Sequence, residues 1–444
     1  MSEQGTDERG MGNKHTSEGD TGTGDARGGP TGVLDMGMLA VDAATMGFWR
    51  PDDPVADPAF VAERHRLFDG SFCWPVMALR RSAVAHNIAT MAAFCRRHGL
   101  AFAPHGKTTM SPSLFADQLA AGAWGITVAT ANQLLVAWSW GVPRIILANE
   151  LVDPPRLAWL ARALAAAPGR EVLLYVDSVE GVALADEAVH GHGRLRVLVE
   201  IGHAGGRTGA RERGTVDAVA RAVAGADGLQ LAGVAAYEGG LREAASVASY
   251  LGEVRCTVLR LHDAGLLRSQ PVVTAGGSAW FDVLADVLAG PWAEGLNPMV
   301  VLRSGAYVSH DNGIYAVKTP FTRVPQQGSL VAGLEVWAQV TSRPEPDLAI
   351  VGMGKREVPY DEGLPVLRAV RRRGSVTTEP IEGLQVAVTN DHHAYLPVPA
   401  GVRLDVGDLL CFGVSHPCTA FDKWRAMPLL EDDDTVAGVV RTFF

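Results

Sequence analysis

The chain has 444 residues, of which 47% are hydrophobic and 20% charged, so it is long enough for two globular domains. A formal net charge of -10 without a long basic run excludes a strongly basic surface for nucleic acid or an anionic membrane, and it favours a small-molecule partner. The five irregularly spaced cysteines, the absence of an apolar stretch of roughly 18 residues and the absence of a signal-peptide pattern indicate a cytoplasmic protein.

The first 75 residues divide into two segments. Residues 1–32 are rich in Gly, Thr, Asp and Glu and contain almost no large apolar side chain, so we expect a disordered tail. Residues 33–75 scatter aromatic side chains among prolines and lack a clear period. We expect this segment to pack against a later domain.

Residues 76–320 carry the clearest order, because short apolar runs alternate with segments of helical period. Strands are predicted at 100–104, 126–130, 145–148, 172–177, 196–200, 231–237, 271–275 and 299–302. Helices are predicted at 113–122, 132–140, 155–167, 179–190, 216–223, 243–264 and 280–288. Eight strands with alternating helices predict an α/β fold, a (β/α)8 TIM barrel.

Residues 321–444 have a different texture, with β-branched residues broken by Pro and Gly. Apolar runs at 329–340, 347–352, 384–389 and 408–412 predict strands. The C-terminal part is therefore expected to be an all-β domain.

Lys107 follows the first predicted barrel strand, at the end of the barrel where catalytic residues of this fold gather. A lysine amine forms a Schiff base when it is partly deprotonated, which burial and cationic neighbours promote. His105 lies two residues earlier and could supply a hydrogen bond there. The alternative is a surface lysine in a loop between a strand and a helix.

Two glycine-containing loops follow later strands. Thr274, Gly276 and Gly277 lie between the seventh strand and a helix, where barrel enzymes often bind phosphate, although a simple tight turn has the same pattern. Arg207 is the permanent charge in the loop 202–209 after the fifth strand. It could hydrogen-bond a pyridine nitrogen and keep it unprotonated, or it could be exposed. Tyr237, at the end of the sixth strand, could contact an aromatic ring or fill the barrel.

Several histidines could bind a metal or move protons. His416 and Cys418 would lie on one face of an extended segment, and one nitrogen with one sulfur ligand favours zinc, although such a pair is often structural. Residues 390–393 supply further imidazoles. His310 and Asp311 follow the eighth strand and could form a proton-transfer pair or a structural hydrogen-bonded pair.

Three motifs, taken in order, resemble a known family. They are Pro-His-Gly-Lys-Thr at 104–108, Thr-Ala-Gly-Gly at 274–277 and His-Pro-Cys at 416–418. They are similar to the motifs of the D-serine dehydratase and D-threonine aldolase group, which belongs to the alanine-racemase-like, fold-type III pyridoxal-phosphate enzymes. Within this group, the sequence resembles a bacterial branch of amino-acid deaminases. The resemblance spans about 75–423 and implies an alanine-racemase-type barrel, a β domain that includes a strand from before the barrel, and a homodimer.

The resemblance also implies roles for single residues. Lys107 would be the Schiff-base lysine, with His105, Arg207, Tyr237, Thr274, Gly276 and Gly277 around pyridoxal 5'-phosphate, and His416 and Cys418 would bind Zn2+. The cysteine at the second metal position, Cys418, resembles the dehydratases, because the aldolases usually have Asp at that position. His393 matches a histidine that follows two acidic residues in much of the group, but Asp391 and His392 stand here. We place His393, His310 and Asp311 near the substrate or behind the site.

The implied function is a pyridoxal-phosphate- and zinc-dependent dehydratase and deaminase of β-hydroxy D-amino acids, a lyase like D-serine ammonia-lyase that converts D-serine to pyruvate and ammonia. A metal-dependent D-threonine aldolase, which yields glycine and an aldehyde, is the nearest alternative. A racemase leaves the His-x-Cys pair without a purpose. A non-catalytic pyridoxal-phosphate protein, and an unrelated barrel enzyme with a surface lysine, are further alternatives.

Overall fold

Eight short parallel strands form a barrel in the computed structural model, which describes residues 39–268, 270–292 and 295–444. The strands are β4 (Ala101–Phe102), β5 (Ile126–Val128), β6 (Arg144–Glu150), β7 (Glu171–Val176), β8 (Leu195–Ile201), β9 (Leu229–Ala236), β10 (Val272–Ala275) and β11 (Met299–Leu302). They pair in the order β4-β11-β10-β9-β8-β7-β6-β5, and a bridge between His105 and Thr127 joins the two ends. The eight predicted strands and the barrel are confirmed; the tail expected at 1–32 lies outside the described residues.

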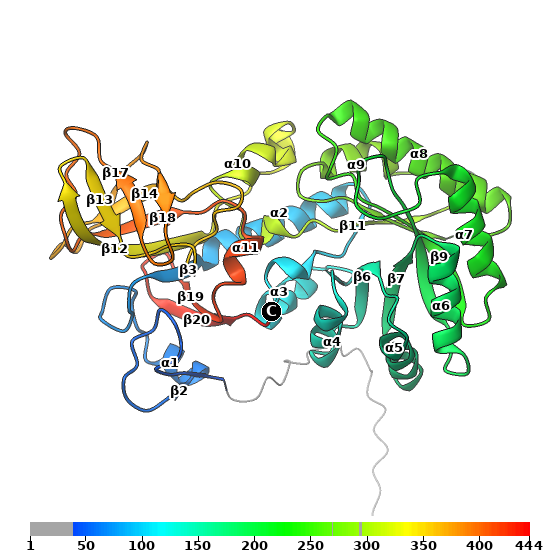
Figure 1. Cartoon of the computed structure of the whole chain (residues 1–444), viewed down its shortest axis with the longest axis horizontal. Coiled ribbons are helices and arrows are strands. Elements are labelled where there is room, and N and C mark those ends of the chain that lie inside the picture. Colours follow the sequence, from blue (N-terminus) through cyan, green and yellow to red (C-terminus); the bar gives the residue numbers. More distant parts are fainter. Residues whose placement is uncertain (1–38, 269, 293–294) are drawn as a thin grey trace, which may run out of the picture. The chain divides into compact units, whose positions relative to one another are not determined.

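Helices follow the strands and pack outside them (Figure 1). They are α3 (Pro112–Ala120), α4 (Ala131–Ser139), α5 (Pro154–Ala166), α6 (Val179–Val189), α7 (Arg213–Gly225), α8 (Ala244–Asp263) and α9 (Phe281–Leu288). The side chains of Thr130, Asp153 and Ser178 accept hydrogen bonds from the first-turn N–H groups of α4, α5 and α6. All seven predicted helices are present.

The sequence prediction missed one helix of the barrel wall, α2 (Arg81–Arg97). Its Phe94 ring packs against Phe281 at a centroid distance of 4.9 Å and against Phe321 at 5.9 Å. The Asn87 amide donates to the carbonyl of Val308, in the short 3-10 helix η2 (Ala306–Val308) that follows β11. Because α2 precedes the first barrel strand, the alternation of strands and helices does not reveal it.

The C-terminal part is an antiparallel β domain, as predicted. Its strands are β12 (Leu334–Glu345), β13 (Leu348–Val351), β14 (Val366–Arg371), β15 (Glu379–Pro380), β16 (Val388–Thr389), β17 (Ala394–Pro397), β18 (Leu409–Gly413), β19 (Ala426–Leu430) and β20 (Val436–Arg441). β3 (Val76–Arg80), from before the barrel, pairs antiparallel with β12 and parallel with β19. A strand from before the barrel therefore joins this sheet, as the resemblance implied.

The segment before β3 packs on the β domain. It contains β1 (Ala40–Val41), β2 (Val55–Ala56) and α1 (Asp57–Ala62). Phe48, Phe60 and Phe72 share one buried cluster with Trp337 and Leu430. The Arg441 guanidinium also donates to both carboxylate oxygens of Asp57. Aromatic burial thus holds a segment that has little regular structure.

We expect Phe60→Ala to lower the free energy of unfolding by about 3–5 kcal/mol, because Phe60 is 2% exposed and its removal leaves a cavity in this cluster. Trp49→Ala is the matched control, since the Trp49 side chain is 59% exposed. It should change the free energy of unfolding by less than about 0.5 kcal/mol. Urea unfolding monitored by circular dichroism measures both; equal effects would contradict this description of the cluster.

Hydrogen bonds connect the β domain to the carboxyl end of the barrel. The Asn312 N–H donates to the Val414 carbonyl at 3.0 Å, and the His416 N–H donates to the Asp311 carboxylate at 3.0 Å. Phe443 donates to the carbonyl of Met110, close to the 3-10 helix η1 (Gly106–Thr108). The barrel and the β domain therefore form one compact unit.

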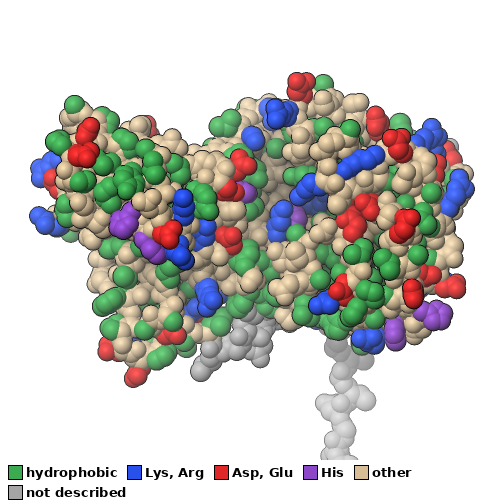
Figure 2. Space-filling view, viewed as in Figure 1, with side chains coloured by type: hydrophobic (Ala, Val, Ile, Leu, Met, Phe, Trp, Pro, Cys, Tyr) green, Lys and Arg blue, Asp and Glu red, His purple; other side chains and the backbone are tan. Residues whose placement is uncertain are grey.

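The surface carries charges of both signs. On the face shown in Figure 2, acidic and basic side chains of the coloured residues are interspersed. Exposed ion pairs such as Arg156–Asp153 contribute little to stability. Within the described part of the chain, no helix combines the length and the apolar character that crossing a bilayer requires.

Candidate active site at the mouth of the barrel

A cavity of about 560 Å³ lies at the carboxyl ends of the barrel strands, where they meet the β domain. Its volume suits a small molecule. Eight of the twelve candidate residues line it: His105, Lys107, Arg207, Tyr237, Gly276, Gly277, His416 and Cys418. Residues more than 300 positions apart therefore meet in one cavity, which the strand order of a barrel makes possible.

Lys107 projects into this cavity from η1, directly after β4. Burial lowers the pKa of its amine, and the charges of Arg207 and Arg303 lower it further against the opposing effect of Cys418. Gly106 permits this turn, since a Cβ there would lie 2.3 Å from the Phe115 ring. A larger fraction of the Lys107 amine is thus neutral, and able to react with a carbonyl, than for an exposed lysine.

His105, two residues before Lys107, presents a buried Nδ1 atom without a hydrogen-bond partner. Burial lowers the pKa of this imidazole well below its usual value, and the charges of Lys107 and Arg303 add to the effect. His105 is therefore neutral at physiological pH. An orphaned polar atom that faces a cavity indicates a missing partner, such as a bound molecule.

His416 and Cys418 enter the cavity from the β domain. We expected an extended segment here, and this expectation was wrong. His416 has a φ of 59°, and Cys418 begins the short helix α11 (Cys418–Phe421). The His416 Nδ1 lies 2.5 Å from the Asp361 carboxylate, and the Cys418 Sγ lies 3.2 Å from the Thr108 hydroxyl. A hydrogen bond with Cys418, followed by the effect of Asp361, raises the pKa of His416 to about 9.

The contact with Asp361 engages the Nδ1 atom of His416, so Nε2 is the nitrogen that a metal would bind. A carboxylate on one imidazole nitrogen is the usual arrangement around a histidine whose other nitrogen binds a metal. Sequence reasoning missed Asp361, which is distant in the chain and has no motif of its own.

Arg207 and Tyr237 contact each other. The Arg207 guanidinium lies over the Tyr237 ring, 4.4 Å from its centroid, and both side chains are partly exposed at the edge of the cavity. Tyr237 therefore does not fill the barrel, which was the alternative we considered. The interaction holds the guanidinium over an aromatic face, where a cation is attracted to the ring.

The loop after β10 differs from the expectation in one respect. The amides of Gly276 and Gly277 donate to the Glu238 carboxylate at 3.0 and 2.8 Å, and Glu238 is fully buried. The loop thus binds an anion, but that anion is a side chain of this protein. Gly276 is required here, because its φ is 91° and a Cβ would lie 2.4 Å from the Leu302 side chain.

Thr274 lies below the cavity and contacts Arg303, a second residue that sequence reasoning missed. Thr274 is fully buried, and its hydroxyl donates to the Val301 carbonyl and accepts from Arg303 at 2.9 Å. Arg303 also donates to the Ala236 carbonyl and lines the cavity. Thr274 therefore positions an arginine in the floor of the cavity.

The remaining candidates lie outside the cavity lining. Asp311 is buried and accepts hydrogen bonds from the N–H groups of Gly313, Tyr315, Ala316 and His416. It thus supports the segment that carries His416, and it is not engaged with the side chain of its neighbour. His310 is buried, with an unpartnered Nδ1. His393 is exposed in the turn between β16 and β17.

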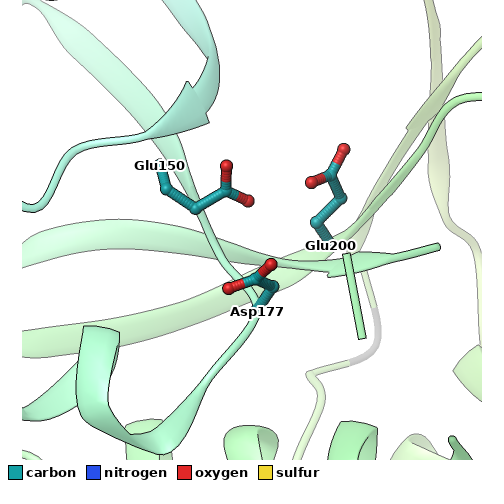
Figure 3. Close-up of side chains that lie close together, drawn as sticks. All are labelled: Glu150, Asp177 and Glu200. Atoms are coloured by element: carbon teal, nitrogen blue, oxygen red, sulfur yellow. The ribbon is translucent and has the colours of Figure 1, made fainter. Parts of the chain in front are cut away.

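Three carboxylates that we did not predict meet at the ends of adjacent strands. Glu150 ends β6, Asp177 follows β7 and Glu200 lies on β8, and one oxygen or more from each lies within 4.8 Å of the others (Figure 3). Glu200 lines the cavity. The rule that functional residues follow barrel strands could have found all three, because Asp177 and Glu200 end predicted strands and Glu150 comes two residues after another.

Burial, with a further contribution from Glu200, raises the pKa of Glu150 to about 8. A carboxyl group with a raised pKa holds its proton in the folded state, so the stability from that proton is present below about pH 4.3 and is lost as the pH rises towards 8. Glu150→Gln cannot ionise. In chelator-containing buffer, its melting temperature relative to wild type should therefore be higher at pH 9 than at pH 6, by roughly 2–5 °C.

Thermal unfolding at the two pH values measures this difference. The exposed Glu345→Gln variant controls for the change of charge. If the melting temperature of Glu150→Gln differs from that of the wild type by the same amount at pH 6 and pH 9, Glu150 is already ionised in the folded protein at pH 6.

The residues present fit the cofactor and the metal that the resemblance implies. At the lysine end, the buried Lys107 amine and the orphaned His105 nitrogen face a cavity of suitable volume. At the other end, the amides of Gly276 and Gly277 are already paired with Glu238. The Ser278 hydroxyl, which lies 3.2 Å from that of Ser304 and lines the cavity, is a donor that this end offers to a phosphate. The imidazole and thiol of His416 and Cys418 suit a borderline metal such as zinc.

Comparison with known families gives two matches along the chain. Residues 79–285 match the family of the alanine racemase N-terminal domain. Residues 333–430 match a serine dehydratase domain family, D-ser_dehydrat. The first match covers most of the barrel, and the second covers most of the β domain.

Similar proteins span most of the chain. A D-threonine aldolase from an Arthrobacter species is 26% identical over 367 residues, which are 81% of this chain and 89% of that protein. The crystal structure of a D-threonine aldolase from Filomicrobium marinum superposes with a TM-score of 0.70 at 25% identity and covers 84% of this chain and 95% of its own. A D-threo-3-hydroxyaspartate dehydratase, as a cysteine variant in the metal-free form, has a TM-score of 0.66 at 22% identity, with coverages of 84% and 97%.

Proposed function

Because this chain is an alanine-racemase-like, fold-type III protein that joins an alanine racemase N-terminal domain to a serine dehydratase-type domain, we propose that it is a pyridoxal-phosphate- and metal-dependent lyase of β-hydroxy D-amino acids. The more specific proposal is the dehydration and deamination of D-serine. In that reaction water leaves the substrate and is returned when the enamine is hydrolysed, so the products are pyruvate and ammonia.

One observation carries this proposal. The lysine of the barrel and the histidine and cysteine of the β domain line the same cavity, and the Thr108 hydroxyl beside Lys107 contacts the Cys418 sulfur at 3.2 Å. An amine for a carbonyl cofactor and two ligands for a metal are thus adjacent. The proposed metal-dependent lyase needs both, whereas a protein that only stores the cofactor has no need for the metal ligands.

Each residue has a task in this reaction. Lys107 would hold pyridoxal phosphate, which, when bound, withdraws electrons from the α-carbon of the substrate. The Lys107 Nζ, with its lowered pKa, is suited to accept the α-proton. His416 and Cys418 would hold a metal that polarises the β-hydroxyl as a Lewis acid. Asp361 fixes the orientation of the His416 ring through Nδ1.

The cysteine at the second metal position favours dehydration over aldol cleavage. The dehydratase with a similar fold is described in a metal-free form as a cysteine variant. We infer that Cys418 is a metal ligand in this chain, and that the metal is zinc, because nitrogen and sulfur ligands suit it.

D-Threonine aldolase activity is the second candidate. The relatives with this name cover 81% to 84% of the chain, which is as much as the dehydratase covers. In that case the bond between Cα and Cβ breaks, and a base removes the proton of the β-hydroxyl. His416 and Cys418 would hold the metal in either reaction, so the products must decide between them.

The test is to incubate the purified protein with D-serine and, separately, with D-threonine. Equal amounts of pyruvate and ammonia from D-serine support the dehydratase, while glycine and an aldehyde from D-threonine identify the aldolase. Interconversion of enantiomers without either product set would identify a racemase. Bound cofactor with no conversion of β-hydroxy D-amino acids would identify a non-catalytic carrier. We also propose a homodimer, which light scattering on the same sample measures.

A further inference from the structure

Glu150, Asp177 and Glu200 form a carboxylate cluster that the proposed reaction does not use. One oxygen atom from each carboxylate lies within 4.8 Å of the corresponding oxygen atoms of the other two, and the side chains point toward a common space (Figure 3). Among the described residues, no ion pair involves any of the three. Glu200 is 93% buried, since its relative exposure is 7%, and its Oε2 atom and the Oε1 atom of Glu150 lack hydrogen-bond partners. A buried carboxylate such as Glu200 is costly without an ion-pair partner, so a positive partner is expected.

A second, independent observation indicates a ligand at this place. Tyr175 is 2% exposed, and its hydroxyl has no hydrogen-bond partner. Tyr175 and Asp177 are two positions apart at the end of β7, so their side chains lie on one face. Tyr175 also lines the cavity beside Glu200. A buried hydroxyl in native proteins is nearly always satisfied, so its partner would be a bound ion or its water.

We propose that Glu150, Asp177 and Glu200 form a second metal site, which binds a hard divalent cation such as Mg2+ or Ca2+ at the carboxyl ends of β6, β7 and β8. The three carboxylates supply the ligand oxygens, and Tyr175 lines the same cavity as Glu200. This site is separate from His416 and Cys418, which belong to the β domain. The proposal does not depend on the proposed reaction.

The donor atoms decide which metal suits each site. The cluster has only oxygen donors, which are the ligands of Mg2+, Ca2+ and Mn2+. The other site has a nitrogen and a sulfur donor, which suit zinc. One oxygen of Asp177 already accepts from the Gly209 N–H at 3.0 Å, which fixes its orientation. A cation there would offset the negative charge that the three carboxylates bring together beside the cavity.

The experiment is isothermal titration calorimetry of the full-length protein with Ca2+ and, separately, Mg2+. The protein is first treated with a chelator and exchanged into metal-free buffer at pH 8.5. We expect one saturable site per chain. Glu200→Gln should weaken the binding at least about tenfold, because the number of charged ligands sets the affinity of such sites.

Three further variants make the result specific. Glu150→Gln has the shape of a protonated Glu150 but cannot ionise, so it should also weaken the binding of the cation. The exposed Glu345→Gln should leave the affinity unchanged. A His416→Ala, Cys418→Ala double variant should keep the site. Circular dichroism confirms that each variant is folded.

Absence of saturable binding at pH 8.5 in the wild type would overturn the proposal, and so would full affinity in both Glu200→Gln and Glu150→Gln. Loss of binding in the His416→Ala, Cys418→Ala double variant would assign the ion to that histidine and cysteine, and it would also overturn the proposal. These outcomes are read without substrate, so they do not depend on whether the proposed reaction takes place.

Discussion

Lys107→Ala is expected to abolish conversion of β-hydroxy D-amino acids, with a loss of at least about 10²–10⁴-fold, and to remove the visible absorbance of bound pyridoxal phosphate. The loss is large because no other lysine of the described residues lines the cavity, so the variant lacks both the attachment of the cofactor and the amine that accepts the α-proton. Product formation and the absorbance spectrum of the purified variant, prepared with added cofactor, measure the two effects.

Lys318→Ala is the matched control, since Lys318 is exposed on α10 (Ile314–Lys318), away from the cavity lining. It should keep both the absorbance and the rate. A Lys107→Ala protein that retains the absorbance of a covalently bound cofactor would contradict the assignment of Lys107.

Removal of the metal is expected to have a second large effect. A thorough chelation, or His416→Ala, should lower the rate of pyruvate formation from D-serine at least about 10²-fold, because the β-hydroxyl loses a Lewis acid worth several kcal/mol. The cofactor absorbance should remain, because Lys107 and the loop after β10 are unchanged. Rate and absorbance of the same sample separate the two contributions.

Readdition of Zn2+ should restore the chelated wild type but not His416→Ala. Cys418→Ala should behave like His416→Ala, whereas Cys256→Ala should have no effect, because Cys256 is an exposed thiol on α8. Full activity after chelation would remove the metal from the proposed reaction and leave the histidine and cysteine with a structural task.

Much of the fold follows from local patterns. Each barrel strand is an apolar run, and Thr130, Asp153 and Ser178 mark helix starts by the side-chain hydrogen bonds that they accept. The exceptions have physical reasons. Helix α2 precedes the first strand and so falls outside the alternation. A strand was predicted at 384–389, but β16 covers only Val388–Thr389. In the earlier part of this run, Gln385 pairs with Val366 through an isolated bridge and not through a continuous ladder.

The candidate site was predicted less completely than the fold. Motifs indicated Lys107, His416 and Cys418, because the short motifs at 104–108 and 416–418 that carry the family resemblance contain them. Glu238, Arg303 and Asp361 were missed, since a buried charged residue is recognised by its partners and these are distant in the chain. The two glycine amides predicted to bind phosphate proved to be paired with Glu238.

The amino-acid sequence alone determined the two kinds of domain, the order of strands and helices and the lysine at the first strand, because apolar periodicity and turn residues act over a few positions. Only the tertiary structure decided which charges meet. Closing the barrel brings Glu150, Asp177 and Glu200 together, and docking the β domain places Cys418 beside Thr108. Charge and hydrogen-bond partners depend on distances of a few ångströms between residues that are up to 310 positions apart, and no local pattern records those distances.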